Sequence, residues 1–273
     1  MENLENRGQE YTMEQGVLRC VVPDPAIYYR EVPARVLALF VAAAAKDCAI
    51  EADTYIAAMG AVDGISRLPA AVVRSALQNI LLSPRPEAIA PLLARGVLTP
   101  FGLRMGEVCL HELAKVPCAM EVRWWRFLRL VGADYRTVCD RLGFAPAFAA
   151  ALAGLDKLSG VQVLPETVLE LKLLLSALPE LDYEAAVKTL ALEDARWESQ
   201  LALYDRLYRS GEPYRMRELA ITVGQLAVLG IRDKRAAWVQ RQLLEAVIKS
   251  PEINQYPALE MLARTLNQQY QGT

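Results

Sequence analysis

The sequence is poor in histidine and lacks the cysteine spacing of metal sites. Among its 273 residues there is a single histidine, His111, and its five cysteines show no C-x-x-C spacing. We therefore expect no zinc site, no disulfide framework and no His-based catalytic centre, and a reducing cytoplasm is the expected location. An H-E-x-x-H zinc helix starting at His111 would need a second histidine where the chain has Lys115.

Phosphate-binding loops and long apolar runs are also missing. Neither G-x-x-x-x-G-K-[ST] nor G-x-G-x-x-G occurs, so no Gly-rich loop is expected to hold a phosphate. The polar, acidic N-terminus is unlike a signal peptide, and the apolar run 36–45 is too short to cross a bilayer. We expect no membrane partner.

The charge is nearly balanced overall but unevenly distributed. The net charge is −2, yet residues 150–200 carry nine acidic against four basic side chains, whereas residues 201–273 carry ten basic against seven acidic ones. The C-terminal segment therefore favours a polyanionic partner, whereas the 150–200 segment does not.

Apolar residues recur at i, i+3 and i+4 along most of the chain, which predicts an all-α fold, an elongated array of helices. Strand-like alternation is confined to residues 17–22 and 161–164. Glycine and proline divide the pattern into expected helices at 26–47, 52–60, 69–82, 86–95, 104–115, 120–131, 134–142, 146–157, 165–176, 183–208, 215–228, 234–249 and 256–270.

Paired carboxylates that could hold two metal ions are scarce. Asp182 and Glu184 have D-x-E spacing, but they stand at a predicted helix start, where acidic residues cap N–H groups and favour the helix dipole. We therefore assign no catalytic residue and no metal ligand.

The stretch E-V-R-W-W-R-F-L-R-L places Arg123, Arg126 and Arg129 three residues apart, beside Trp124 and Trp125. A basic helix face with aromatics can bind a phosphate backbone and stack on exposed bases. Alternatively, the aromatic and aliphatic residues fill a core while the arginines stay solvated. The spacing is compatible with both interpretations.

A second basic group stands near the C-terminus. Arg232, Lys234 and Arg235 follow a glycine and begin a predicted helix. Cations at a helix start oppose its dipole, whereas a bound anion there would be stabilised by the backbone N–H groups. The group is therefore a candidate anion-binding site, or simply a solvated helix start.

The order of several motifs resembles the bacterial CCA-adding tRNA nucleotidyltransferases and poly(A) polymerases. G-V-L-R-C-V, Y-Y-R-E-V-P-A-R-V-L and L-Q-N-I-L-L-S-P-R-P-E-A-I-A-P-L-L-A-R-G-V-L resemble the family's neck. V-R-W-W-R-F-L-R-L-V-G-A-D with R-L-G-F-A-P resembles its body. R-E-L-A-I-T-V-G-Q-L-A-V-L-G-I, L-L-E-A-V-I and P-A-L-E-M-L-A-R-T-L resemble its tail, so that the resemblance covers residues 14–270.

The resemblance implies a four-part organisation. A polar N-terminus with a remnant of the head's last strand (1–22) is followed by a neck-like domain (23–96), a body-like domain (97–182) and a tail-like RNA-binding domain (183–273). In that family a β-sheet head precedes the neck and carries a D-x-D pair that binds the catalytic metals. This chain begins where that head would end, so no cofactor is expected, and Mg²⁺ would serve only a separate catalytic head.

The family's nucleotide-reading motif, E-D-x-x-R in the neck, is incomplete here. Glu31 and Arg35 match it, but Val32 stands where the base-reading aspartate would be, and valine cannot form a hydrogen bond. A second neck motif keeps only Arg74. The resemblance thus implies a degraded nucleotide site at Glu31, Arg35 and Arg74.

The family's body and tail grip tRNA by shape and phosphate contacts, which depend less on particular residues. The resemblance implies that such contacts would come from Arg123, Arg126, Arg129, Arg215, Arg217, Arg232, Lys234 and Arg235. The tail differs from the family at R-D-K-R, because family members often have glycine and proline at these positions.

Three functions follow from these observations. The first is a headless neck–body–tail protein that binds tRNA or another structured RNA and is not catalytic alone. The second is a fragment or subunit of an active nucleotidyltransferase whose head is supplied elsewhere. The third is a helical protein–protein adaptor, which the net charge of −2 and the acidic 150–200 segment favour.

Overall fold

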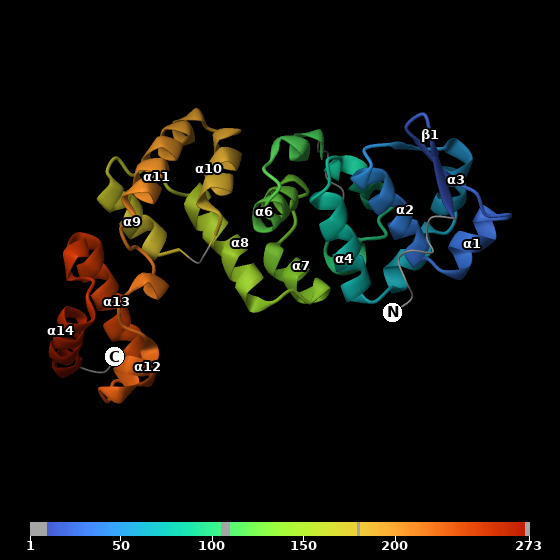
Figure 1. The fold of residues 1–273 in the computed structure, drawn as a ribbon. Coiled ribbons are helices and arrows are strands. Elements are labelled where there is room, and N and C mark those ends of the chain that lie inside the picture. The colour runs from blue at the N-terminus through green and yellow to red at the C-terminus, as the bar shows by residue number, and fades with distance from the viewer. Residues whose placement is uncertain (1–9, 105–109, 179–180, 271–273) are drawn as a thin grey trace. The chain divides into compact units, whose positions relative to one another are not determined.

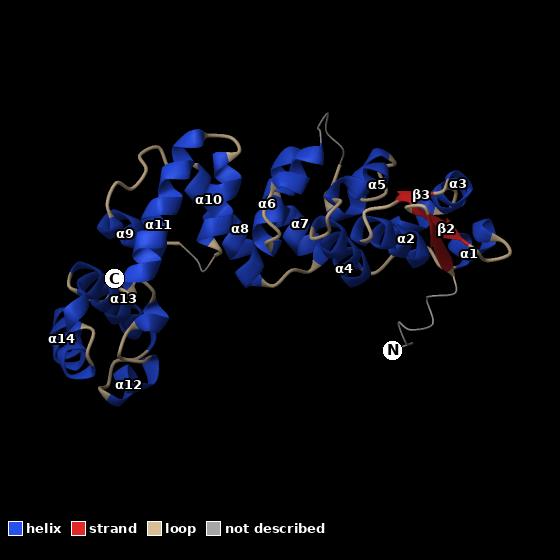
Figure 2. Ribbon diagram, turned by 45° about the horizontal axis from the view of Figure 1, so that its top comes forward, coloured by secondary structure: helices blue, strands red, loops and turns tan. Residues whose placement is uncertain are grey.

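The computed structural model describes residues 10–104, 110–178 and 181–270 and is mainly helical (Figures 1 and 2). The all-α prediction is confirmed, with the addition of one small three-stranded sheet. The chain divides into two compact units, an N-terminal unit of residues 1–157 and a C-terminal unit of residues 158–273. The four-part division remains a prediction.

The sheet lies at the start of the N-terminal unit. Strands β1 (Tyr11–Glu14) and β2 (Val17–Cys20) form an antiparallel hairpin, and β3 (Ala49–Ile50) pairs with β2 in parallel. Gln15 and Gly16 make the hairpin turn with φ values of 50° and 77°, the left-handed conformation that two-residue hairpin turns require.

The sequence patterns that predicted strands had different outcomes. The pattern at 17–22 corresponds to β2, whereas residues 161–164 form no strand in the described structure. Residues 1–9 of the predicted N-terminal segment lie outside the described residues, as does Cys109.

Helices of the N-terminal unit pack around α2 and α4, whose apolar faces meet each other. The helical segments are α1 (Pro25–Glu31), α2 (Ala34–Ala45), α3 (Ala52–Met59), η2 (Val62–Arg67), α4 (Ala70–Leu81), η3 (Pro86–Ile89), α5 (Ala90–Ala94), η4 (Thr99–Phe101), η5 (Leu110–Lys115), α6 (Met120–Leu130), α7 (Tyr135–Leu142) and α8 (Pro146–Ser159).

The prediction of one helix over 26–47 is wrong, because the chain breaks between α1 and α2. Val32 is extended, with φ −133° and ψ 87°, as a residue before proline tends to be. Pro33 then packs against Gly64 of η2. A Cβ atom on Gly64 would overlap Pro33 Cγ and lie 2.7 Å from Pro33 Cβ, so this break requires glycine at position 64.

The C-terminal unit is helical throughout its described part. Its helical segments are α9 (Val168–Ser176), α10 (Tyr183–Ala191), η6 (Ala195–Trp197), α11 (Glu198–Ser210), η7 (Met216–Glu218), α12 (Val223–Val228), α13 (Asp233–Lys249), η8 (Pro251–Ile253) and α14 (Tyr256–Gln269). The last three α-helices share one core, built from Leu226, Val239, Leu243, Val247 and Leu259.

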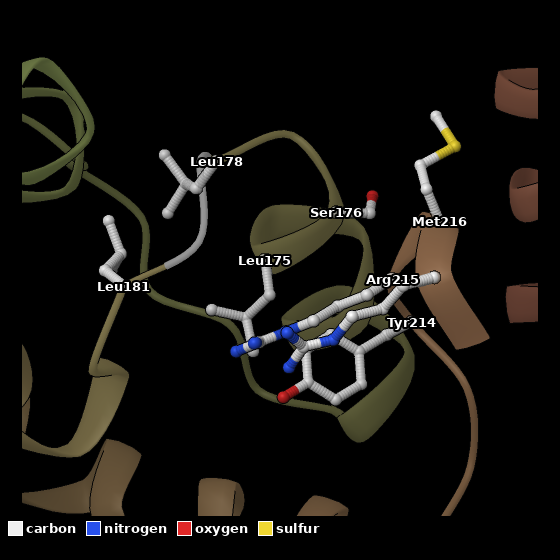
Figure 3. Close-up of a pocket in the computed structure, with 8 residues that line it drawn as sticks. Leu175, Ser176, Leu178, Leu181, Tyr214, Arg215 and Met216 are labelled. Atoms are coloured by element: carbon white, nitrogen blue, oxygen red, sulfur yellow. The ribbon is translucent and has the colours of Figure 1, made fainter. Parts of the chain in front are cut away.

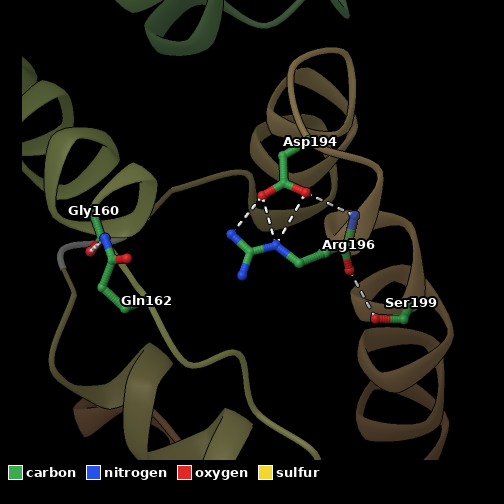
Figure 4. Close-up of polar contacts among 5 residues, drawn as sticks. All are labelled: Gly160, Gln162, Asp194, Arg196 and Ser199. Carbon is green, nitrogen blue, oxygen red and sulfur yellow. Dashed lines mark hydrogen bonds and ion pairs between the residues drawn. The ribbon is translucent and has the colours of Figure 1, made fainter.

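The predicted helix 183–208 is also interrupted. Asp182 caps α10 by accepting a hydrogen bond from the Ala185 N–H at 2.9 Å, which agrees with its predicted capping role. Asp194 then starts η6, because its carboxylate accepts from the Arg196 backbone N–H at 3.0 Å (Figure 4). Its ion pair with the Arg196 guanidinium and the bond from Ser199 Oγ to the Arg196 carbonyl fix this corner.

Three further predicted helices differ from the structure. The 86–95 helix is divided into η3 and α5, and the 215–228 helix into η7 and α12. Of the predicted 104–115 helix, residues 105–109 lie outside the described residues and the rest is the 3₁₀ helix η5. The other helices start and end within three residues of their predicted bounds.

Candidate nucleic-acid interface

Glu31 and Arg35, two of the three residues of the predicted nucleotide site, lie at the break between α1 and α2. The Arg35 guanidinium Nη1 donates to the Tyr28 carbonyl at 3.0 Å, and its Cζ lies 4.0 Å from the Tyr28 ring centroid. Glu31 is exposed, and Val32 exposes 41% of its surface as an apolar side chain. Arg35 is thus held against α1, where it stabilises the break.

Arg74 is engaged in a different contact. Its Nη1 donates to the Leu142 carbonyl at 3.1 Å and to the Gly143 carbonyl, and its Cζ lies 5.6 Å from the Phe144 ring centroid. A cation at the last carbonyls of a helix satisfies orphan acceptors and complements the dipole. Arg74 therefore caps α7, and its hydrogen bonds do not converge with those of Arg35.

Arg123 is the most buried of the candidate arginines, with 6% of its surface exposed. Its Nε donates to the Val116 carbonyl at 3.1 Å, and its Nη1 donates to the carbonyls of Leu81 and Ser83, both at 2.7 Å. Burial lowers the pKa of this guanidinium, although arginine stays charged in proteins. Arg123 joins α6 to the end of α4, away from solvent.

The other two arginines of α6 also have partners within the unit. Arg126 Nη2 pairs with Glu112 Oε2 at 2.8 Å and its side chain is only 11% exposed. Arg129 is exposed, and its Cζ lies 4.9 Å from the Trp125 ring centroid. Trp124 is fully buried, and Trp125 Nε1 donates to Asp156 Oδ1 at 2.7 Å. The two tryptophans belong to the core, so their rings do not face an incoming base.

Arg215 and Arg217 line a hollow of about 250 Å³ in the C-terminal unit. Arg215 and Tyr214 lie side by side there, close to Leu175 (Figure 3), with Arg215 Cζ 5.0 Å from the Tyr214 ring centroid. Ser176 also lines the hollow, but its Oγ donates to the Leu173 carbonyl at 2.8 Å. Guanidinium groups are the side chains best suited to a phosphate group.

The sequence did not lead us to expect Tyr214 and Ser176 in the wall of this hollow. The dipeptide Tyr214-Arg215 has the same pattern as the W-W-R stretch, an aromatic residue followed by a basic one. Ser176 had no such signal, because α9 and η7 lie far apart in the sequence.

The second basic group stands at the start of α13. Arg232, Asp233, Lys234 and Arg235 are all exposed. Arg235 Nη1 donates to Asn267 Oδ1 at 3.3 Å and its Cζ lies 5.2 Å from the Tyr270 ring centroid. By contrast, neither Arg232 nor Lys234 forms an ion pair or side-chain hydrogen bond with another residue of the described ranges.

Asp233, between these cations, has a backbone φ of 55°. This is the left-handed region, which glycine adopts readily and aspartate only at a cost. The start of α13 thus combines a glycine-like backbone with charged side chains.

The two basic groups are at opposite ends of α13. Asn254 lies just beyond the C-terminal end of α13. Its side chain accepts a hydrogen bond from the Ala220 N–H at 2.8 Å and donates one to the Glu218 carbonyl at 2.9 Å. These bonds place η7, with Arg215 and Arg217, at the C-terminal end of α13. Arg232 and Lys234 stand at the other end. Since α13 has 17 residues, it spans about 25 Å. A ligand that contacts both groups must be at least that long.

Within residues 10–104, 110–178 and 181–270, no group of three or more His, Cys, Asp or Glu residues is placed to hold a metal ion. In that part of the chain, no helix has the length and apolar character needed to cross a membrane.

The comparisons with known proteins give a match in structure but none in sequence. No protein-family model matches the chain, and no curated protein matches it in sequence. The crystal structure of the Bacillus stearothermophilus CCA-adding enzyme in complex with CTP is similar to it, with a TM-score of 0.58 at 16% sequence identity. The alignment covers 94% of this chain and 68% of the enzyme chain. The chain therefore shares its fold with this CCA-adding enzyme over nearly its whole length.

Proposed function

We propose that the chain binds tRNA or another structured RNA and has no nucleotidyl-transfer site of its own. The observation that carries this proposal is the pair of exposed cations, Arg232 and Lys234, without ion-pair partners in the described structure. Two like charges at a helix start destabilise it unless an anion neutralises them. The likeness in fold to a CCA-adding enzyme supports RNA, rather than another polyanion, as the ligand.

The separation of the basic groups supports a structured RNA over a mononucleotide. The Arg215–Arg217 hollow and the Arg232–Lys234 pair stand about 25 Å apart along α13, farther than one nucleotide reaches. Phosphate contacts of this kind read shape and not sequence.

The absence of a nucleotide-reading role rests on the α1–α2 break. Val32 offers no acceptor for a base amino group, and Arg35 already donates to the Tyr28 carbonyl. We therefore propose that neither residue selects a nucleotide, and that any Mg²⁺-dependent step would need a separate catalytic head.

The test is a titration of a tRNA transcript with the purified chain across a salt series. We expect the logarithm of the affinity to fall linearly with the logarithm of salt concentration, as counterions are released. Replacing Arg232→Gln and Lys234→Gln together should weaken binding and reduce the salt slope by about one per lost phosphate contact.

A matched control removes the same charges elsewhere in the C-terminal unit. Arg196→Gln with Lys188→Gln also removes one arginine and one lysine, but each is paired with an acid, Asp194 and Glu184 respectively. This variant should bind tRNA as the natural chain does. Equal losses in both variants, or no tRNA binding at low salt, would overturn the proposal.

A second candidate is a subunit that docks a separately encoded catalytic head. The observation favouring it is a set of exposed apolar side chains on, or directly after, β1, β2, α1 and α3, comprising Met13, Val21, Ile27, Val32 and Ile56. These elements adjoin one another, since α1 packs on α3 and Tyr28 of α1 donates to Glu10 beside the hairpin. Incorporation of labelled CTP into tRNA by the chain mixed with a homologous head, but not by either alone, would favour this candidate.

A further inference from the structure

An aromatic and basic cluster lies on α13, next to the cations proposed to contact RNA phosphates. Arg232, Arg235 and Trp238 follow one another at three-residue intervals, so they lie along one flank of the helix. The helix rises by about 4.5 Å from Arg235 to Trp238. An aromatic ring therefore stands within one helical turn of Arg235.

Tyr270, directly after α14, completes this cluster. Its ring centroid lies 5.5 Å from that of Trp238, and the two ring planes meet at 58°. Arg235 Cζ lies 5.2 Å from the centroid of the same Tyr270 ring. Both aromatic side chains are half-buried, and Trp238 also packs against the core that α12, α13 and α14 share. The two rings thus support the Arg235 guanidinium and are themselves held by the core.

Arg235 is held in place but keeps most of its donors. Its Nη1 donates to Asn267 Oδ1 at 3.3 Å, so that Asn267 and Tyr270 together position the guanidinium. Within residues 10–104, 110–178 and 181–270, Arg235 forms no other hydrogen bond and no ion pair, and its side chain is exposed. A guanidinium is a flat group with five N–H donors. Arg235 is therefore a flat, exposed cation supported by an aromatic ring.

The neighbouring cations have no such support. In the described part of the chain, neither Arg232 nor Lys234 lies over an aromatic ring, although both are exposed. A surface cation of this kind is sufficient to contact a phosphate. Guanidinium planes and aromatic rings are, in addition, the groups on which unpaired RNA bases stack. The support under Arg235 therefore favours a partner with a flat face.

We propose that Arg235 stacks on an unpaired base of the bound RNA, with Tyr270 on the other side of the guanidinium, while Arg232 and Lys234 contact phosphates nearby. This inference rests on the proposed RNA binding and adds a feature of the RNA, a loop or bulge with at least one unstacked base. The bases of a continuous duplex stack on one another and do not offer a free face.

The test compares two hairpin RNAs that share one stem and one loop length. One loop carries its bases and the other is abasic. Both hairpins have the same phosphates, so the release of counterions contributes equally to both affinities. We expect the natural chain to bind the base-bearing hairpin at least about fivefold more tightly, the smallest effect expected of one stacked base.

The variant Arg235→Lys keeps the positive charge and removes the flat group. It should lose at least about fivefold in affinity for the base-bearing hairpin and less than about twofold for the abasic one. The salt dependence of both should stay unchanged, because no charge is lost.

Two further variants control for the support and for position. Tyr270→Leu removes the ring next to the guanidinium and should reduce the preference for the base-bearing hairpin, while the far-ultraviolet circular dichroism stays native. Arg264→Lys makes the same exchange on α14, where Arg264 pairs with Glu260, and should bind both hairpins as the natural chain does.

The outcomes separate base stacking from RNA binding itself. Equal affinity of the natural chain for the two hairpins would overturn base stacking and leave RNA binding intact. A preference for the base-bearing hairpin that persists in Arg235→Lys would also overturn the proposal, because the base would then lie elsewhere. No binding of either hairpin at low salt would overturn it as well, whereas the tRNA titration alone decides the proposed function.

Discussion

The arginines of α6 and the cations around α13 are similar in sequence and different in structure. Both groups are dense in basic residues beside an aromatic. In α6, Arg123 is buried on three carbonyls and Arg126 is paired with Glu112. Around α13, Arg232 and Lys234 project from the surface. A basic stretch is therefore available to a nucleic acid only where the surrounding fold leaves its donors unused.

The difference arises from what each helix packs against. The end of α4 leaves the Leu81 and Ser83 carbonyls pointing into the interior, and these need a donor that only a long side chain supplies. The start of α13 presents N–H groups and no backbone carbonyls. Arg235 reaches the Asn267 side chain, whereas Arg232 and Lys234 have no acceptor in the described ranges. An arginine near the carbonyls at a helix C-terminus is thus held by the fold, whereas one at a helix N-terminus can contact a ligand.

The largest effect on stability is expected for the buried arginine of the N-terminal unit, Arg123. Arg123→Met leaves three carbonyls without a donor and should lower the free energy of unfolding by about 3 kcal/mol. Arg129→Met, the matched control on the exposed side of α6, should cost less than about 1 kcal/mol. Urea denaturation of both variants measures this. Equal stability of the two would remove the contrast between buried and exposed arginines.

RNA affinity should separate the same two regions. Arg215→Gln with Arg217→Gln is expected to weaken tRNA binding about tenfold at low salt, because two donors to phosphate are lost. Arg126→Gln with Arg129→Gln removes equal charge from α6 and should change affinity less than about twofold. Filter binding at several salt concentrations measures both. A larger loss from the α6 pair would reverse the assignment of the interface.

A smaller effect is expected for the aromatic part of α6. Trp125→Phe removes the hydrogen bond from Nε1 to Asp156 and should lower the free energy of unfolding by about 1–2 kcal/mol. tRNA affinity should stay unchanged, since this ring lies in the core. A double-mutant cycle with Asp156→Asn isolates the bond. Weaker RNA binding at constant stability would mean that the ring faces the ligand.

The smallest effect concerns the backbone of the α13 start. Asp233→Gly should leave stability within about 0.5 kcal/mol of the natural chain, whereas Asp233→Ala should be about 1 kcal/mol less stable than the glycine variant, because φ is 55° there. Both remove a negative charge between two cations, so both should bind tRNA more tightly. Thermal denaturation and the tRNA titration test the two statements separately.

The helical class and most helix positions could be predicted because they depend on local periodicity. The breaks were missed where one residue outweighed that pattern, as when Pro33 forced Val32 out of the helix or Asp194 capped a new turn. Both signals were present in the sequence, but the apolar spacing continued through them.

The candidate site was harder to predict, for a physical reason. Arg123 binds carbonyls 42 and 40 residues away, and Arg74 binds carbonyls 68 and 69 residues away. No local pattern encodes such partners. The exposure of Arg232 and Lys234 was easier to anticipate, because a helix start offers a cation N–H groups and no carbonyls of its own.

The contact between Pro33 and Gly64 constrains how this chain can diverge. Alanine at position 64 overlaps the proline ring, but it becomes acceptable once Pro33 has been replaced by a smaller, more adaptable residue. The two replacements are therefore epistatic, and only one order of mutation avoids a poorly folded intermediate. Among related sequences, a residue other than glycine at position 64 should occur only where the proline at position 33 has already been lost.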